Sequence, residues 1–444
     1  MLKAGFISLG CAKNLVDTEV MLGALAADDI QLTTEPGEAD ILIINTCSFI
    51  DSAKEESIST ILQMAEYKQT GKCRGIIVAG CLGQRYQQEL LDEIPEIDGI
   101  VGTGSWQRIG EAVDAVLSGR RVLFIDDVNT IYDDQMPRIT TTPFYSAYIK
   151  IADGCSNCCS YCVIPRIRGE FRSRGIESVI AEARQLAARG IKEINLIAQD
   201  TTSYGRDLYG SPQLTKLLKE LVKIDGIMWI RLLYCYPRYF SDELIALIAS
   251  EPKICKYVDL PLQHADDGIL KAMNRRDSRR DSEILLAKLR DGIPDVVIRT
   301  SFIVGFPGET EAQFEALRQF MLEQKFERAG VFTYSQEEST PAAVMPEQIS
   351  EDVKQERYHC LMSLQCKISE ERNQKMEGKI LKVVIEGVDT EQSNVVLGRS
   401  YREAPDVDGQ IYIENAGKCH VGDVVDVQIV QGFTYDLLAE KLPE

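Results

Sequence analysis

The sequence lacks several features that mark other classes of protein. It has no charged and then apolar leader at its N-terminus and no apolar run of the roughly 20 residues that a membrane helix needs. It also has no excess of basic residues, since 49 Lys and Arg face 68 Asp and Glu and give a net charge of −19. We therefore expect a cytoplasmic protein with no membrane partner and little affinity for nucleic-acid phosphates, and a basic protein partner suits it better.

Histidine is scarce as well, with three in 444 residues, and we interpret His264 as a hydrogen-bonded structural residue rather than a catalytic base. Cysteine, in contrast, occurs thirteen times. Cytoplasmic thiols stay reduced, so abundant cysteine in such a protein indicates metal binding or catalysis.

The most informative cysteines lie together within residues 152–162. Three and then two residues separate Cys155, Cys159 and Cys162, which we call the central cysteine set. Three thiolates at this spacing can ligate three irons of a 4Fe-4S cluster and leave the fourth iron open to a substrate. A structural zinc site needs a fourth Cys or His, and no further pair follows at zinc-ribbon spacing. Cys155, Cys158 and Cys162 form an alternative set with the spacings reversed, and we prefer Cys159.

A second cysteine set is predicted from its position in the first domain. Buried strands are predicted over residues 4–9, 41–45 and 75–79. Each is followed within two residues by a cysteine, and these are Cys11, Cys47 and Cys81. Strands that alternate with helices form a parallel sheet, whose carboxyl ends meet at one edge. We therefore infer a second three-thiolate cluster site, the N-terminal cysteine set. Cys73 precedes its strand and is left out, and three unrelated buried thiols are the alternative.

The helical stretches between these strands support the alternation. The clearest covers residues 51–68, with apolar residues at helical spacing, which are Ile58, Ile61, Leu62 and Ala65.

The central cysteine set resembles the cluster motif of the radical S-adenosylmethionine (SAM) superfamily. The resemblance implies that the open iron binds SAM, that the reduced cluster cleaves the cofactor to a 5′-deoxyadenosyl radical, and that Tyr161 lies against the adenine. A three-cysteine domain ahead of a radical domain resembles the methylthiotransferases, which insert sulfur into a C–H bond and leave it methylated. It implies two 4Fe-4S clusters, the N-terminal one carrying the sulfur, and SAM used once for methylation and once for the radical.

We predict an α/β protein with an N-terminal open parallel-sheet domain at 1–125, a linker at 126–143, a partial (β/α)6 barrel at 144–376 and a small β-barrel at 377–444. Strands of the central domain are predicted over 147–152, 193–198, 228–234, 256–260, 296–304 and 329–334. Active sites of such barrels lie at the carboxyl ends of the strands. Gln199 is therefore a candidate for the amino-acid end of SAM, and Gly305 for close approach of the adenine.

The C-terminal region combines a helix with short strands. Residues 349–376 predict a helix that packs on the barrel, with an apolar side of Val353, Tyr358, Leu361, Leu364 and Ile368. Strands predicted at 383–385, 395–397, 410–413 and 424–430 indicate a small β-barrel. This barrel resembles the TRAM module, which holds the substrate in related enzymes. It has six basic and twelve acidic residues from Gly378 on. This acidic balance disfavours binding of tRNA, because a tRNA-binding module should be basic.

Residues 8–19, 261–265 and 398–405 resemble one branch of the methylthiotransferases. The resemblance implies an enzyme that modifies the β-carbon of an aspartate in small-subunit ribosomal protein number twelve, and an electron donor such as flavodoxin. A tRNA adenosine methylthiotransferase is the alternative.

Overall fold

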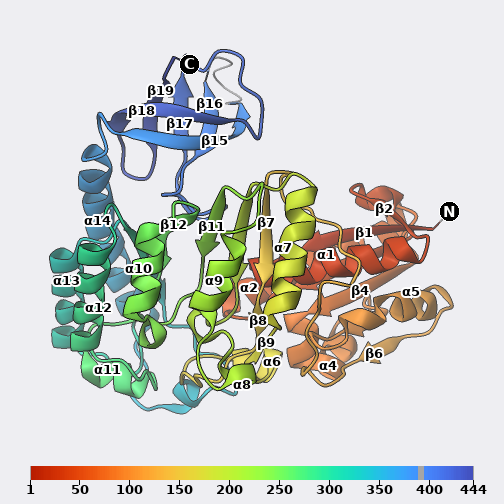
Figure 1. Cartoon of the computed structure of the whole chain (residues 1–444). Coiled ribbons are helices and arrows are strands. Elements are labelled where there is room, and N and C mark those ends of the chain that lie inside the picture. The colour runs from red at the N-terminus through yellow and green to blue at the C-terminus, as the bar shows by residue number, and fades with distance from the viewer. Residues whose placement is uncertain (1, 389–394, 444) are drawn as a thin grey trace.

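The computed structural model describes residues 2–388 and 395–443 and has three parts along the chain (Figure 1). Residues 389–394 and 444 of the predicted C-terminal domain lie outside the described residues. No helix in the described part combines the length and apolar composition that a membrane crossing requires.

The N-terminal part is an open sheet of six parallel strands in the order β2-β1-β3-β4-β5-β6. The strands are β1 (Lys3–Ser8), β2 (Gln31–Thr33), β3 (Ile41–Thr46), β4 (Gly75–Gly80), β5 (Gly99–Val101) and β6 (Val122–Phe124). The helices are α1 (Ala12–Ala27), α2 (Asp51–Ala65), α3 (Tyr67–Thr70), α4 (Cys81–Glu93) and α5 (Ile109–Leu117). The three strands predicted from the sequence are confirmed as β1, β3 and β4. The other three have three residues each, too few to show a pattern.

Helices cover both faces of this sheet. Along β3, Ile41 and Ile43 pack with α1 and α5, whereas Leu42 and Ile44 pack with α2 and α4. Every residue of β3 and β4 is buried, which explains their continuous apolar sequence.

The helix predicted over residues 51–68 is instead two helices, α2 and α3. Ile61 and Ala65 of its predicted apolar face are buried, but Ile58 and Leu62 are exposed. The apolar stripe is wider than the contact that α2 makes with the sheet. Ile58 lines a surface groove between α2 and α4 instead.

The segment between β6 and β7 (Ser146–Lys150), all of it described, contains neither helix nor strand. It is nevertheless packed. Arg138 pairs with Glu19 of α1 at 2.5 Å and with Glu182 of α7 (Ile176–Ala188). A Cβ at Gly23 of α1 would lie 2.3 Å from the Pro137 carbonyl oxygen, so the segment lies directly on the helix.

The central part contains a six-stranded parallel sheet in the order β14-β13-β12-β11-β10-β7. Its strands are β7 (Ser146–Lys150), β10 (Glu193–Ile197), β11 (Trp229–Leu232), β12 (Ile254–Asp259), β13 (Val297–Val304) and β14 (Arg328–Thr333). A separate two-stranded antiparallel sheet consists of β8 (Ala152–Asp153) and β9 (Arg172–Ser173). The helices are α6 (Ile164–Arg168), α7 (Ile176–Ala188), α8 (Arg206–Tyr209), α9 (Leu214–Leu221), α10 (Asp242–Ser250), α11 (Asp267–Ala272), α12 (Arg279–Gly292) and α13 (Glu311–Gln324). All six predicted strands are present, and the sheet stays open between β7 and β14, as a partial barrel does.

The long helix α14 (Glu351–Gln374) packs back on β14, as predicted, but through a largely polar face. Leu361 and Ile368 are buried, together with Arg357 and Gln365. Arg357 pairs with Glu309 at 2.9 Å, and the Gln365 amide donates to the Phe326 carbonyl. Because these buried polar groups have hydrogen-bond partners, α14 can place polar residues on its buried face. The apolar periodicity of its sequence is weak for that reason.

The C-terminal part is a closed barrel in the order β15-β16-β17-β19-β18. The strands are β15 (Ile380–Val388), β16 (Val396–Arg399), β17 (Ile411–Glu414), β18 (Val424–Gly432) and β19 (Leu437–Lys441). The four predicted strands are confirmed, and β19 was missed. It pairs with both β17 and β18 and so closes the barrel.

A buried charge cluster attaches this barrel to the central sheet. Glu193 of β10 pairs with Arg399 of β16 at 2.5 Å and with Arg231 of β11 at 3.1 Å. Burial would raise the pKa of Glu193, but the two guanidinium groups outweigh it and lower that pKa to about 2. The Arg231 guanidinium also donates to the Tyr401 carbonyl.

We expect Arg399→Met to weaken this attachment. Breaking a buried ion pair by removing one partner leaves an uncompensated charge and costs about 3 kcal/mol of unfolding free energy, which urea denaturation measures. Lys382→Met is the control in the same barrel, because its partner Asp426 is exposed and such pairs contribute little. Equal effects of the two changes would contradict the assignment.

Candidate functional site

The N-terminal cysteine set lies at one edge of the N-terminal sheet. Cys11 follows β1, Cys47 follows β3 and Cys81 follows β4. Gly10 has φ +85°, and a Cβ there would lie 2.8 Å from the Cβ of Cys47 and 3.2 Å from its sulfur. Glycine therefore lets the end of β1 approach Cys47. Cys73 lies at the opposite end of β4, where its thiol donates to the Gly75 carbonyl.

Cys11 and Cys47 lie close enough to Cys81 to influence its ionisation, and Cys11 also influences that of Cys47. Burial raises the pKa of Cys81 to about 12, the thiolates of Cys47 and Cys11 add to the rise, and Arg168 opposes it. Burial also raises the pKa of Cys47. For Cys11 burial acts the same way, but Lys13 and Arg168 outweigh it and lower the pKa. The three thiols thus lie beside the cations Lys13 and Arg168, whose positive charge favours the thiolate form.

The central cysteine set occupies the loop between β8 and α6. Gly154 opens it with φ +76°, and a Cβ there would lie 2.1 Å from the Glu170 carbonyl oxygen. The Cys155 N–H donates to the Gly169 carbonyl, and the Cys162 N–H donates to the Cys159 carbonyl. Burial raises the pKa of Cys155 to about 12, and the thiolates of Cys159 and Cys158 add to it.

Cys158 and Cys159 differ in their surroundings. Cys158 is exposed, and its backbone is in the left-handed region with φ +52°. Cys159 is half-buried and lies beside Tyr161, whose pKa is raised by burial and then by the Cys159 thiolate. These positions support Cys159 as the ligand, which stays a prediction.

A cavity of about 1020 Å³ lies where the three parts of the chain meet. Cys11 and Phe49 of the N-terminal part, Tyr161 and Tyr234 of the central part and Asp406 of the C-terminal part line it. The cavity therefore joins a residue of the N-terminal cysteine set to the loop of the central set, and its size suits a ligand larger than a metal cluster.

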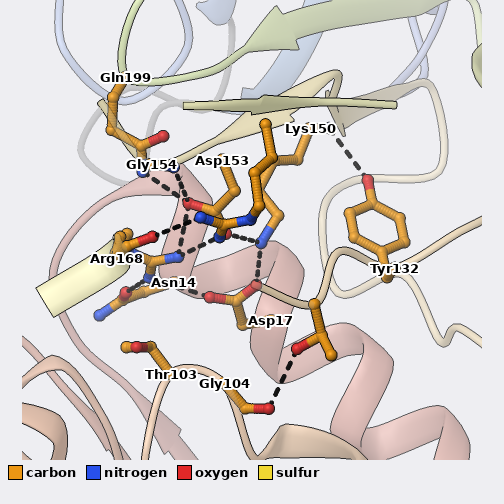
Figure 2. A network of polar contacts seen from close by, with 12 residues as sticks. Asn14, Asp17, Thr103, Gly104, Tyr132, Lys150, Asp153, Gly154, Arg168 and Gln199 are labelled. Carbon is orange, nitrogen blue, oxygen red and sulfur yellow. Dashed lines mark hydrogen bonds and ion pairs between the residues drawn. The ribbon is translucent and has the colours of Figure 1, made fainter. Parts of the chain in front are cut away.

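A buried polar network around Arg168, Asp153 and Lys150 joins the central part to α1 of the N-terminal part (Figure 2). Arg168 pairs with Asp17 of α1 at 2.9 Å and with Asp153 at 3.1 Å. Lys150 of β7 bridges the same two carboxylates, at 2.8 Å to Asp153. Arg168 also lies 3.8 Å from the sulfur of Cys81, and Asp153 accepts from the N–H of Gly154. The network thus fixes the loop that carries the central cysteine set relative to the N-terminal sheet.

The other two predicted SAM contacts, Gln199 and Gly305, are not among the residues that line the cavity. The Gln199 amide donates to Asp153 at 2.9 Å, and its buried Oε1 has no hydrogen-bond partner within the described structure (Figure 2). An unpartnered buried acceptor fits the ammonium group of SAM. Gly305 has φ +72°, and a Cβ there would lie 2.3 Å from the stem of Lys354. Contact with α14 therefore explains this glycine, and its approach to adenine stays a prediction.

His264 is hydrogen-bonded on both ring nitrogens. Nε2 lies 3.1 Å from Glu309, and Nδ1 accepts from the N–H of Asp266. The buried ring therefore holds two loops together, as the structural interpretation expects.

Within the described residues, no group of three His, Cys, Asp or Glu side chains is arranged around a single metal ion. Each cysteine of a 4Fe-4S cluster binds a different iron, so cluster ligands lie farther apart than the ligands of one zinc ion. The two cysteine sets are therefore compatible with clusters.

Sequence reasoning missed the residues that connect the domains, Asp17, Lys150 and Arg168. Charged residues next to a cysteine motif are a weak signal, because their partners are distant in sequence: Arg168 and Asn14 are 154 positions apart.

Family models match the chain in the order of its three parts. The Uncharacterized protein family UPF0004 covers residues 3–102, the Radical SAM superfamily covers residues 149–321 and the TRAM domain covers residues 378–441. The fold and the central cysteine loop thus define a radical SAM enzyme, a class that uses a 4Fe-4S cluster and SAM.

Full-length relatives define the family further. Ribosomal protein uS12 methylthiotransferase RimO of Geobacter sulfurreducens is 55% identical over 439 residues, which cover 99% of this chain and 98% of the relative. The protein of that name in Desulforamulus reducens is 54% identical and covers 98% of each chain. The chain belongs to the RimO family of methylthiotransferases. The predicted enzyme class and the three-part architecture are confirmed.

Solved structures share the fold at low identity. The radical SAM methyltransferase TsrM from Kitasatospora setae, with cobalamin and a [4Fe-4S] cluster bound, has a TM-score of 0.56 and 16% identity over 77% of both chains.

Proposed function

We propose that this enzyme inserts sulfur and a methyl group at the β-carbon of an aspartate in ribosomal protein uS12, with two 4Fe-4S clusters. The observation that supports this most directly is that one cavity is lined both by Cys11 of the N-terminal cysteine set and by Tyr161 of the loop that carries the central set. In this proposal Cys11, Cys47 and Cys81 bind the auxiliary cluster, and Cys155, Cys159 and Cys162 bind the radical cluster. We also propose the domain boundaries 1–125, 126–143, 144–376 and 377–444, and the arrangement of the chain in three folded parts supports them.

When bound, the clusters and SAM supply the sulfur and the radical that removes hydrogen from the substrate. The chain itself positions the reactants. Tyr161 forms the cavity wall beside the central set, and Gln199 offers its free oxygen to the cofactor's ammonium. The network around Arg168 keeps the two cysteine sets in a fixed relation, which matters because small errors in reactant geometry cost large factors in rate.

Partners follow from the same chemistry. The radical cluster needs an external one-electron reductant, and we propose a flavodoxin-like donor. A ribosomal substrate places the enzyme in the cytoplasm. The acidic C-terminal barrel supports a basic protein substrate rather than tRNA.

Mass spectrometry of uS12 tests this function. We expect uS12 from wild-type cells to have a methylthio mass increment on one aspartate, and uS12 from cells without the gene to lack it. Loss of methylthiolated adenosine from tRNA, with uS12 unchanged, would support the tRNA alternative instead.

A further inference from the structure

Lys13 is a buried lysine without a carboxylate partner, and the nearby group that can become an anion is the thiol of Cys11. It lies in the first turn of α1, two residues after Cys11, and its exposed fraction is 7%. Its Nζ lies 3.0 Å from the centre of the Tyr234 ring. Among the described residues, none forms an ion pair or hydrogen bond with this amine.

The carboxylates around Lys13 are already paired with other groups. Asp259 accepts from the N–H of Tyr234 at 2.8 Å and pairs with Arg299 at 3.1 Å. Asp153 pairs with Lys150 and Arg168. In the proposed function the Cys11 sulfur binds the auxiliary cluster, so no carboxylate of the described residues is left to balance the ammonium of Lys13. A buried ammonium is costly without such a counterion, and a carboxylate from outside the chain would stabilise it.

Lys13 is not itself a lining residue of the cavity, but it lies directly behind residues that are. Cys11, Tyr234 and Asp259 all line the cavity. Tyr234 has φ +59° and is fixed by hydrogen bonds on both sides, because its N–H donates to Asp259 and its carbonyl accepts from the N–H of Thr201. A cation on an aromatic face keeps N–H groups free for an anion.

We propose that Lys13 binds the carboxylate of the target aspartate and thereby selects an anionic side chain as substrate. This inference rests on the proposed function. The β-carbon of aspartate is bonded directly to its carboxylate carbon. A carboxylate on Lys13 therefore places the reacting carbon next to Cys11, beside the N-terminal cysteine set, where sulfur would be delivered.

The test compares two fluorescent peptides that span the uS12 target site, one with aspartate and one with asparagine at that position. Anisotropy measures their binding to the enzyme with both clusters and SAM. We expect wild-type enzyme to bind the aspartyl peptide at least about ten-fold more tightly, the usual size of a charged hydrogen bond. Lys13→Met should bring the two affinities within about two-fold, and Lys13→Arg should restore part of the preference. Lys253→Met is the control, because that amine donates to the Ile224 carbonyl instead.

The alternative role of Lys13 is to balance the charge of the N-terminal cysteine set. In that case Lys13→Met would shift the midpoint potential of the auxiliary cluster and leave the preference for aspartate unchanged, which would overturn the inference. If wild-type enzyme neither binds nor modifies the aspartyl peptide, the proposed function itself fails, a result distinct from a retained preference in Lys13→Met.

Discussion

Cys47→Ala is expected to abolish methylthio transfer while reductive cleavage of SAM continues. Cys47 lies at the end of β3 between Cys11 and Cys81, and the central set is in a separate loop of another domain. Loss of one of three ligands should release the auxiliary cluster and leave the radical cluster intact. Iron content should fall from about eight to about four per chain. Anaerobic reconstitution with iron analysis, and assays for methylthio product and 5′-deoxyadenosine, measure both effects.

Cys73→Ala is the matched control for this change. Cys73 is also a buried cysteine of the N-terminal sheet, but it lies at the amino end of β4. The Cys73→Ala enzyme should retain all its iron and full methylthio transfer. If Cys47→Ala keeps about eight irons per chain or still inserts sulfur, the N-terminal cysteine set is not a cluster site.

Cys159→Ala should eliminate SAM cleavage, whereas Cys158→Ala should retain it. The half-buried Cys159 lies beside Tyr161 in the loop, but the neighbouring Cys158 is exposed, with its carbonyl accepting from the Asn274 amide. A thiolate must face the cluster to bind it, and exposure of Cys158 indicates that its side chain points elsewhere. The yield of 5′-deoxyadenosine from the dithionite-reduced enzyme measures the difference.

Absorbance and iron content separate ligand loss from misfolding in this pair. Cys159→Ala should keep the auxiliary cluster, and therefore about half of the iron, which shows that the chain is folded. The reverse result, with Cys158→Ala inactive and Cys159→Ala active, would assign the alternative ligand set.

Strand ends were predictable in this chain because they depend on local signals. The apolar runs of β3 and β4 are long enough to identify, and the cysteine that follows each run marks the functional edge of the sheet. The short strands β2, β5 and β6 could not be predicted from the sequence, because three residues are too few to show an apolar pattern. Strand β19 was missed for a related reason: its sequence contains Glu440 and Lys441, and only pairing with β17 and β18 makes it a strand.

Single side chains were harder to interpret than elements. Gly305 was predicted to admit a ligand, which stays a prediction, and the stem of Lys354, 49 positions away in the sequence, is a second reason for the missing Cβ that the sequence did not reveal. The buried face of α14 was predicted to be apolar and is largely polar, because Glu309 and the Phe326 carbonyl give its polar groups partners.

The sequence by itself determined the chemistry of this protein, because cluster ligands within one loop are related by covalent chain length and need no knowledge of the rest of the fold. It also determined the order of the three domains. Only the tertiary structure decided how the two cysteine sets are connected, since Arg168 meets Asp17, and Lys13 meets Tyr234, only when the N-terminal sheet docks on the partial barrel. Such contacts depend on how the complete surfaces of both domains fit together, and a short segment of sequence does not reveal them.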